Sequence, residues 1–272
     1  MDNLNAFQVK REICEIGRRM YERNYVAAND GNISVRISDR EILTTPTGVS
    51  KGFMTPEMIV CVDMDGKVIS GSLKPSSELK MHLRVYRERP DVRSVVHAHP
   101  ITATAFSVCG MGLDKAFMPE LVVTLGVVPL ADYATPGTTE VPDSITQYLK
   151  DYNAVLLAHH GALTWGKDLM EAYFRLESVE FSAQIVWKAR MIGSPNQIPC
   201  EKLGELVKIR ESMGIHGVVP TCDACGVSGS CAAGASNTAR IGSASSVSAA
   251  RSSTAQPSPA ASELEDIVAR VT

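Results

Sequence analysis

The sequence predicts an α/β protein in which helices cover a mixed or antiparallel sheet. Two observations support this prediction: helical and strand patterns interleave along the chain, and several neighbouring strands are joined by short turns. Parallel neighbours would need crossover connections of a dozen or more residues, so the hairpins argue against a doubly wound parallel fold. The 272 residues are enough to bury a sizeable core in one large domain.

The first quarter of the chain reads as one helix and two β-hairpins. Residues 6–26 carry apolar side chains at helical intervals. Two short alternating segments, 33–37 and 41–45, form the first expected hairpin. In the second hairpin, residues 59–63 and 67–69 flank an Asp-Gly turn, which supplies the positive φ angles that a tight turn needs.

The remaining elements alternate between helices and strands. Ser76 and Ser77 are suitable N-cap residues in front of a helix over 78–88. The elements expected after it are a strand over 92–97, a helix from near Pro100, strands over 121–130 and 154–158, and a long helix over 168–191.

Composition and charge exclude several functional classes. Hydrophobic residues make up 44% of the chain, charged residues 21%, and the formal net charge is −3. This balance offers no basic surface for nucleic acid, and no apolar run reaches the roughly 18–20 residues that cross a bilayer. The N-terminus mixes charges into a helical pattern and lacks the apolar stretch of a secretory signal. The expected location is therefore cytoplasmic, without a membrane or nucleic-acid partner.

Four of the six histidines fall in two short motifs. His97 and His99 are two residues apart at a strand end, so their side chains face the same side of the strand. His160, at another apolar strand end, could complete a three-histidine site. Three protein ligands with one open position are the pattern of a catalytic zinc, although Mn²⁺, Fe²⁺ and Co²⁺ suit such a site too. The alternative is that these are ordinary polar residues at strand ends.

Glu78 is the best candidate for a catalytic acid or base. It falls in the first turn of the expected helix, where the helix dipole and a nearby metal ion would favour the carboxylate. Taken alone, it could equally be a solvent-facing glutamate at a helix start. His82 lies one turn later on the same face, which indicates a structural or supporting role rather than a metal ligand.

Three small polar pairs lie at expected turns or helix starts: Gly31-Asn32, Thr47-Gly48 and Ser76-Ser77. Each pair offers backbone amides or hydroxyl groups without bulk, which is what a phosphate group needs. Singly, each pair is only a turn. The pattern predicts a phosphate site if the fold brings the three pairs together.

At these residues the chain resembles the class II aldolase family, which contains L-fuculose-phosphate aldolase and L-ribulose-5-phosphate 4-epimerase. The resemblance covers about residues 5–215, with the motifs in the family's order and spacing. These motifs are Gly31-Asn32-Ile33-Ser34, Thr45-Pro46-Thr47-Gly48, Pro75-Ser76-Ser77-Glu78 with Met81-His82, Val96-His97-Ala98-His99-Pro100, and His160-Gly161.

The resemblance implies α/β/α layers around a mostly antiparallel central sheet, and a homotetramer with active sites between subunits. It also implies one zinc ion per subunit, with His97, His99 and His160 as ligands. Glu78 would be the acid/base and could also touch the metal. The residues implied to bind the substrate phosphate are Asn32, Thr47, Gly48, Ser76 and Ser77.

The reaction implied by the resemblance is aldol cleavage of a ketose 1-phosphate, which chelates the ion through its carbonyl and adjacent hydroxyl oxygens. The ion stabilises the enediolate left when the C–C bond breaks, and Glu78 returns the proton to that carbon. The expected substrate is L-fuculose 1-phosphate, with L-rhamnulose 1-phosphate as a second candidate, and the products are dihydroxyacetone phosphate and L-lactaldehyde. Schiff-base chemistry on Lys51, Lys74 or Lys80 is a rival route that the histidine set makes unnecessary.

Two positions bear on which family reaction is expected. Glutamate at position 78 favours an aldolase, because the epimerases that resemble this chain carry aspartate there. Fuculose-phosphate aldolases place a tyrosine, proposed to protonate the aldehyde-side oxygen, where this chain has Met118, and Tyr133 matches another family segment. Epimerisation, dehydration and decarboxylation with the same metal are therefore alternatives.

Composition divides the chain into an expected catalytic domain, 1–216, a linker, 217–261, that becomes rich in serine and alanine, and an end segment, 262–272. Ser262 and Glu265 form a capping box in the end segment, whose apolar residues fall on one helical face. This tail resembles the encapsulation peptides that direct enzymes into the lumen of bacterial microcompartments, where shell or cargo proteins would be its partners. A frayed terminus is the alternative, and a non-catalytic microcompartment scaffold is a rival function.

The seven cysteines form two groups. Cys14, Cys61, Cys109 and Cys200 are expected to be small buried hydrophobes, and the odd count argues against a disulfide framework. The cluster Cys222, Cys225 and Cys231 could bind zinc or an iron–sulfur group, but three cysteines leave such a site incomplete within one chain. Reactive or incidental thiols are favoured, with a metal shared between subunits as the alternative.

Overall fold

The computed structural model describes residues 4–221 of the chain. The expected catalytic domain, 1–216, falls almost wholly within this range. The predicted linker from residue 222 onward, with its three cysteines, and the predicted end segment 262–272 lie outside the described residues. Within the described part, no helix is long and apolar enough to cross a membrane.

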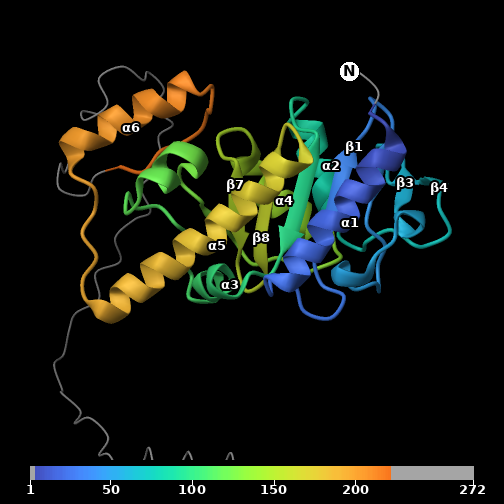
Figure 1. The fold of residues 1–272 in the computed structure, drawn as a ribbon, viewed down its shortest axis with the longest axis horizontal. Helices are drawn as coiled ribbons and strands as arrows, with labels where there is room; N and C mark the ends of the chain where they lie inside the picture. Colours follow the sequence, from blue (N-terminus) through green and yellow to red (C-terminus); the bar gives the residue numbers. More distant parts are fainter. Residues whose placement is uncertain (1–3, 222–272) are drawn as a thin grey trace, which may run out of the picture. The chain divides into compact units, whose positions relative to one another are not determined.

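The described strands form a single sheet. They are β1 (Asn32–Arg36), β2 (Ile42–Thr44), β3 (Val60–Val62), β4 (Val68–Ser70), β5 (Ser94–Ala98), β6 (Leu130–Ala131), β7 (Ala154–Leu157) and β8 (Gly161–Gly166). Their order in the sheet is β4-β3-β2-β1-β5-β8-β7-β6, and every neighbouring pair is antiparallel except β6 with β7 (Figure 1). The sheet is therefore mostly antiparallel, as predicted.

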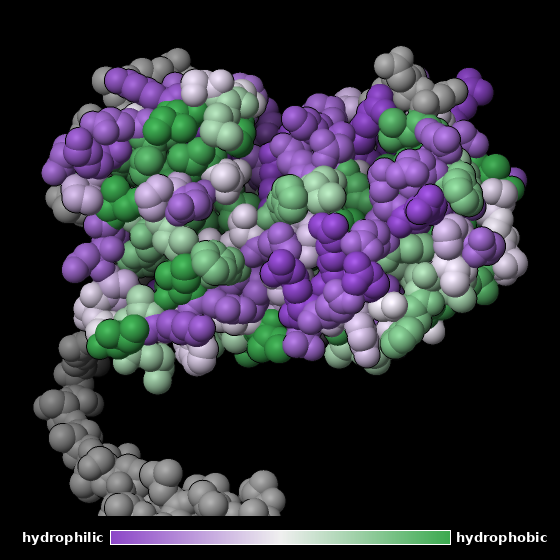
Figure 2. Space-filling view, viewed as in Figure 1, coloured by the Kyte–Doolittle hydropathy of each residue, from purple (hydrophilic) through white to green (hydrophobic). Residues whose placement is uncertain are grey.

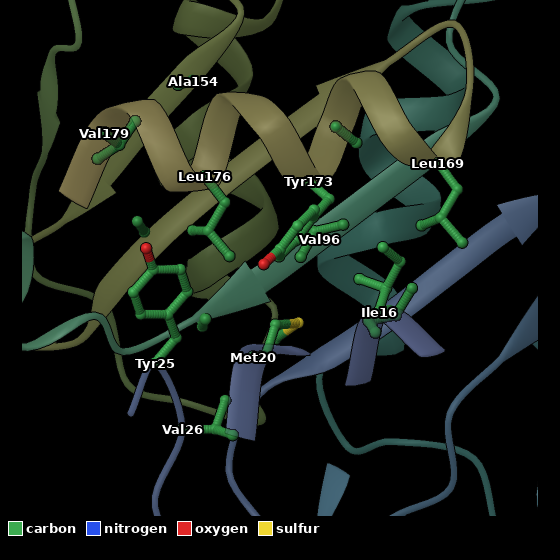
Figure 3. Packing of buried hydrophobic residues seen from close by; sticks show 14 of the residues in the cluster. Ile16, Met20, Tyr25, Val26, Val96, Ala154, Leu169, Tyr173, Leu176 and Val179 are labelled. Atoms are coloured by element: carbon green, nitrogen blue, oxygen red, sulfur yellow. The ribbon is translucent and has the colours of Figure 1, made fainter. Parts of the chain in front are cut away.

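Helices cover both faces of this sheet. The described helices are α1 (Ala6–Glu22), η1 (Lys51–Phe53), η2 (Pro56–Met58), α2 (Leu79–Glu88), α3 (Ile101–Val108), η3 (Leu121–Leu125), α4 (Glu140–Leu149), α5 (Leu169–Ile192) and α6 (Cys200–Ser212). α1, α3 and α5 share a buried cluster with one face of the sheet, while α2 and α4 pack against strand residues of the other face. Figure 3 shows the first cluster, where Met20 of α1 and Tyr173 of α5 approach Val96 of β5. The result is the expected α/β/α arrangement.

The N-terminal helix forms where predicted but ends at Glu22 rather than at residue 26. Asn5 caps its start, because its Oδ1 accepts hydrogen bonds from the amides of Phe7 and Gln8 at 3.0 and 3.3 Å. Asn24 then has a left-handed φ of 58°, which takes the chain out of the helix.

The apolar run 121–130, predicted as a strand, is mostly helical, so that prediction was wrong. Its first half is the π-helical turn η3, and Gly126 follows with a φ of 77°. Only its last residue joins the sheet, as the first residue of β6. Arg210 of α6 stabilises the helical form, since its 1% exposed guanidinium donates to the carbonyl oxygen of Val123 at 2.8 Å. A contact from a distant helix therefore overrides the strand-like pattern.

Five described elements, η1, η2, α4, β8 and α6, have no counterpart in the sequence prediction. The cysteine expectation also needs correction. Cys61 is buried as expected, but Cys14 is only partly buried and Cys109 is exposed. Cys200, at the start of α6, takes part in a disulfide bond, so treating it as a small buried hydrophobe was wrong.

Candidate active site

The end of β5 presents two histidines to one point. His97 lies inside the strand and is fully buried, and His99 follows the strand's last residue. Their Nε2 atoms lie 3.1 Å apart, so the two rings face the same side as the alternation of the strand predicts. The amide of His99 donates to the carbonyl oxygen of Tyr25 at 2.9 Å, which holds the chain in place just beyond the strand.

The turn between β7 and β8 brings His160 to the same point. His159 adopts a left-handed φ of 57°, a conformation that histidine accepts more readily than most residues, and His160 then turns inward. Gly161 follows at a close approach, because a Cβ there would lie 2.7 Å from Cδ2 of His99 and 2.4 Å from the carbonyl oxygen of Ala98. The adjacent glycine therefore makes room for the histidine cluster.

The three rings form a nearly equilateral triangle. Their centroids are 5.0 Å apart for His97 and His99, 4.7 Å for His97 and His160, and 4.9 Å for His99 and His160. One potential ligand atom from each lies within 4.8 Å of the other two. The structure thus brings together the three histidines singled out from the sequence.

Glu78 points into the same cluster from the start of α2. It is the N-cap residue of that helix rather than part of its first turn, and Ser76 accepts a hydrogen bond from its amide at 3.2 Å. Its Oε1 lies 3.1 Å from Nε2 of His160, and its Oε2 lies 3.4 Å from Nε2 of His97. The amide nitrogen of Asn32 donates to Oε2 at 2.8 Å, so β1 holds the carboxylate in place.

The protonation of this cluster follows from burial and hydrogen bonding. Burial alone would raise the pKa of Glu78, but the His97 and His160 rings and the Asn32 amide outweigh it and hold that pKa well below its ordinary range. Burial also lowers the pKa of His97 and His99, which favours neutral imidazoles. A carboxylate beside neutral imidazoles is the protonation state that a metal ion requires.

The ring nitrogens that face away from the cluster fix the direction of the lone pairs. Nδ1 of His97 donates to the carbonyl oxygen of Ala162 at 2.9 Å, and Nδ1 of His99 lies 3.4 Å from Oδ2 of Asp30. The Nε2 atoms of His97 and His99 therefore direct their lone pairs towards one another and towards Glu78. A cation between these atoms would offset the repulsion between them. Their 3.1 Å separation is close to the roughly 3.3 Å expected for two nitrogens on one tetrahedral zinc. The residues fit a divalent metal ion.

A polar cavity of about 380 Å³ opens beside the cluster. His99, His160 and Glu78 line it, together with residues of the three small polar pairs: Gly31, Asn32, Thr47, Ser76 and Ser77. The turns lie together because the amide of Thr47 donates to the carbonyl of Lys74 at 3.0 Å and that of Ser76 to the carbonyl of Thr45 at 3.2 Å. Gly48 lies next to this group with a φ of 74° and is not among the lining residues. The fold thus meets the condition for a phosphate site.

His82 lies behind the histidine cluster. It is 1% exposed, and its Nδ1 lies 2.7 Å from Oγ of Ser34, which in turn lies 2.8 Å from the hydroxyl oxygen of Tyr86. Burial lowers the pKa of His82 to about 4. It lies one turn of α2 away from Glu78 and does not belong to the group of three histidines that could share one metal ion. This agrees with the supporting role expected for it.

Two other charged residues of the cavity were not among the predicted site residues: Asp30 was not considered, and Lys51 was named only for the rival Schiff-base route. Asp30 contacts His99, and Lys51 is buried beside the turn that carries Asp30. Asp30 stands inside the Asn-Asp-Gly-Asn turn, and Lys51 lies three residues after Gly48, so proximity to the motifs was the available signal. No tyrosine lines the cavity among the described residues: Met118 packs against the core, and Tyr133 is 64% exposed.

The sequence model of the class II aldolase and adducin N-terminal domain family matches residues 11–187, which is more than half of the chain. The chain belongs to this family. It is 38% identical to L-fuculose phosphate aldolase of Methanococcus maripaludis over 174 residues. This aligned segment covers 64% of this chain and 93% of that protein. It is 35% identical over 184 residues to 3-oxo-tetronate 4-phosphate decarboxylase of Escherichia coli, covering 66% and 86%.

The fold agrees with that of solved class II aldolases. A structure of L-fuculose 1-phosphate aldolase superimposes with a TM-score of 0.70 at 31% sequence identity, covering 76% of this chain and 97% of that one. Membership of this family, together with relatives named as aldolases, identifies the chain as an enzyme of the lyase class. Metal dependence is general among class II aldolases, and in this chain the histidine cluster could hold the metal ion.

Proposed function

We propose that this chain is a zinc-dependent aldolase that reversibly cleaves L-fuculose 1-phosphate, and also L-rhamnulose 1-phosphate, to dihydroxyacetone phosphate and L-lactaldehyde. One observation carries the proposal: three convergent histidines and Glu78 lie at the wall of a cavity that small polar turns also line. Relatives named for fuculose phosphate cleavage support the substrate.

His97, His99 and His160 would hold the zinc ion through their Nε2 atoms, with Glu78 able to reach the same ion. Bound zinc supplies Lewis-acid stabilisation of the negative charge that develops on the substrate oxygens during cleavage. The protein sets the tautomer of His97 through the carbonyl of Ala162. Mn²⁺, Fe²⁺ or Co²⁺ in place of zinc are outcomes that metal analysis of the purified protein distinguishes.

Glu78 would carry the proton of the reaction. In cleavage the C3–C4 bond breaks, the Glu78 carboxylate would take the proton of the C4 hydroxyl as that oxygen becomes the aldehyde oxygen, and the electron pair of the broken bond passes to C3. A proton delivered by Glu78 to C3 completes dihydroxyacetone phosphate, and condensation reverses the transfer. The hydrogen bond from Asn32 occupies Oε2, so Oε1, which lies 3.1 Å from Nε2 of His160, would be the oxygen that carries this proton.

The substrate phosphate would bind among Asn32, Thr47, Gly48, Ser76 and Ser77. The hydroxyl groups and backbone amides of these turns offer donors without bulk, as phosphate recognition requires. Asn32 also donates to Glu78, so it would join the phosphate end of the cavity to the acid/base.

The test is to incubate the full-length protein with Zn²⁺ and L-fuculose 1-phosphate while coupling dihydroxyacetone phosphate to NADH oxidation. NADH loss that requires both the metal and the enzyme supports the proposal. If no dihydroxyacetone phosphate forms, the aldolase assignment fails. A parallel assay follows metal content in a His97→Ala, His99→Ala double variant, with His159→Ala as the control. Full zinc retention by the double variant would refute the metal assignment.

Decarboxylation of a 3-oxo-tetronate 4-phosphate is the second candidate. It is favoured by the relative that carries this name and by the absence of a tyrosine from the described cavity lining. Loss of carbon dioxide leaves an enolate that Glu78 could protonate, and no group is needed to protonate an aldehyde-side oxygen. Release of bicarbonate from that substrate, without aldolase activity, would decide for this reaction. Epimerase, dehydratase and non-catalytic scaffold roles predict neither product.

We also propose that the enzyme assembles as a homotetramer. Apolar residues of α3 and α5 remain exposed on the single chain, including Ile101 at 68%, Trp187 at 50% and Met191 at 74%. Figure 2 shows hydrophobic patches between hydrophilic ones on the face that carries α5. Burial of such patches favours association. Light scattering after size-exclusion chromatography should give about four times the 29.3 kDa chain mass, and a monomeric mass would refute the assembly.

For the C-terminal segment we propose microcompartment targeting, so that the enzyme would work in the cytoplasm inside the compartment lumen. The support is the sequence pattern of a serine- and alanine-rich linker followed by an amphipathic segment. Fusing residues 255–272 to a fluorescent protein should produce puncta in a host that makes the shell. Diffuse fluorescence in that host would count against targeting.

A further inference from the structure

Lys51 is a buried cation to which the reaction outlined above gives no role. It is 1% exposed, stands at the start of η1 and is one of the residues lining the catalytic cavity. Its Nζ donates to the carbonyl oxygens of Asn29 at 2.9 Å and Val49 at 2.7 Å. Both acceptors are uncharged, and an ammonium group has a third donor. Burying such a charge is costly, which indicates that it is kept for a purpose.

The charges around the cavity are unbalanced for a phosphorylated substrate. The described lining residues include two carboxylates, Asp30 and Glu78, and a single lysine or arginine, which is Lys51. A phosphate monoester carries roughly −1.5 to −2 charges at pH 7. The hydroxyl groups of Thr47 and Ser76 can donate to it but bring no positive charge. Repulsion from the carboxylates would therefore oppose binding unless Lys51 offsets it.

We propose that Lys51 supplies the positive charge of the phosphate subsite and thereby selects phosphorylated substrates over their unphosphorylated counterparts. The inference rests on the proposed function for the identity of the substrate. The hydrogen bonds from Nζ hold the ammonium between the turn at Asn29 and the loop that carries Thr47 and Gly48. Those two segments adjoin two of the three polar pairs. Lysine binds phosphate oxygens as a compact point charge, which suits this position.

The surroundings also argue against Lys51 as a Schiff-base nucleophile. Burial lowers the pKa of Lys51 to about 8, while the Asp30 and Glu78 carboxylates oppose the shift. A group with that pKa is still about nine-tenths protonated at pH 7. A protonated amine that donates to two carbonyls has no lone pair for a substrate carbonyl. The ammonium form suits charge recognition.

The test compares Lys51→Met with Lys74→Met in the full-length metal-loaded enzyme. Lys74 is exposed on the neighbouring loop and is not among the cavity-lining residues, so its loss removes the same charge from outside the cavity. Three quantities are measured: the dissociation constant of inorganic phosphate by calorimetry, kcat/KM for L-fuculose 1-phosphate, and kcat/KM for L-fuculose. The ratio of the two kcat/KM values separates phosphate recognition from a general effect on the fold.

For Lys51→Met we expect phosphate binding to weaken by about 10- to 100-fold, the range for a lost charge-assisted hydrogen bond. The kcat/KM for L-fuculose 1-phosphate should fall by a similar factor, mainly through KM, while that for L-fuculose stays within about threefold. Lys74→Met should match the wild type in all three quantities. An unchanged phosphate dissociation constant, or an equal fall with both sugars, would overturn the proposal.

Two further variants keep the test decisive if Lys51→Met fails to fold. Lys51→Gln keeps N–H donors for the carbonyls but loses the charge, whereas Lys51→Arg keeps the charge. Phosphate affinity should fall in the glutamine variant and remain within about tenfold in the arginine variant. The opposite order would refute the role of the charge. If the wild type fails to cleave L-fuculose 1-phosphate, the proposed function falls, and the phosphate dissociation constants still decide the role of Lys51.

Discussion

Replacing His82 by asparagine should flatten the loss of stability that the protein suffers on mild acidification. His82 is buried, its Nδ1 contacts Ser34, and its Nε2 has no hydrogen-bond partner in the described structure. Protonation would therefore place an unpaired charge inside the fold. Asparagine cannot take up this proton, and its side-chain amide can replace the contact that Nδ1 makes with Ser34.

The magnitude follows from the difference between the folded and unfolded pKa of His82. Burial lowers the folded pKa to about 4, against 6.5 for an exposed histidine. The stabilisation from a neutral His82 is fully present above pH 6.5 and is lost as the pH falls from 6.5 to 4, because only the unfolded chain then binds the proton. Linkage gives a loss of about 2 kcal/mol between pH 7 and pH 5, and about 3 kcal/mol by pH 4.

The measurement is urea unfolding of the wild type and His82→Asn at pH 7, 6 and 5, followed by circular dichroism. The stability difference between the two proteins should shift by about 2 kcal/mol in favour of the variant across this range. Protonation of His97 and His99 affects both proteins and largely cancels. His159→Asn, at an exposed position, should keep the wild-type slope. If the His82→Asn and wild-type curves stay parallel within about 0.5 kcal/mol, the reasoning is refuted.

Three further substitutions test the packing around the site. Glu180→Gln should destabilise the protein by about 2 kcal/mol in urea unfolding, because the carboxylate accepts from two backbone amides at the start of α3. Arg210→Met should cost about 3 kcal/mol in the same assay, since it leaves buried carbonyl oxygens of η3 unpaired; a loss below about 1 kcal/mol would contradict this. Gly161→Ala should weaken zinc binding by about 10- to 100-fold in a chelator competition, because the new Cβ displaces His99, while Gly193→Ala, in open space, should not.

The candidate ligands could be predicted from sequence because their geometry is local. Two residues apart on a strand, His97 and His99 must face the same side, and the structure shows their Nε2 atoms in contact distance. Glu78 had to lie near the start of α2 because of the Ser-Ser pair before it, although it proved to be the cap itself. Spacing of one or two residues fixes direction whatever the rest of the chain does.

The run 121–130 shows where such local reasoning stops. Its valines and leucines favour a strand, and periodicity alone cannot separate a short buried strand from a buried helical turn. The helical turn is stabilised by Arg210, which lies nearly ninety residues later in the sequence. Its guanidinium donates hydrogen bonds to carbonyl groups that a strand would direct elsewhere. The same applies to α4 and α6, whose stability depends on the surfaces they cover.

The groups that orient Glu78 and His97 in the candidate site could not be predicted from the sequence, because their positions depend on the register between strands. Asn32 reaches Glu78 from β1, where its partner across the ladder is His97, and Ala162 meets Ala98 across β5 and β8. A shift of one residue in that second ladder would turn the carbonyl of Ala162 away from Nδ1 of His97. The ring would then lose the bond that fixes its lone pair. The backbone of β8 is therefore as necessary to the proposed metal site as the histidines, although no motif marks it.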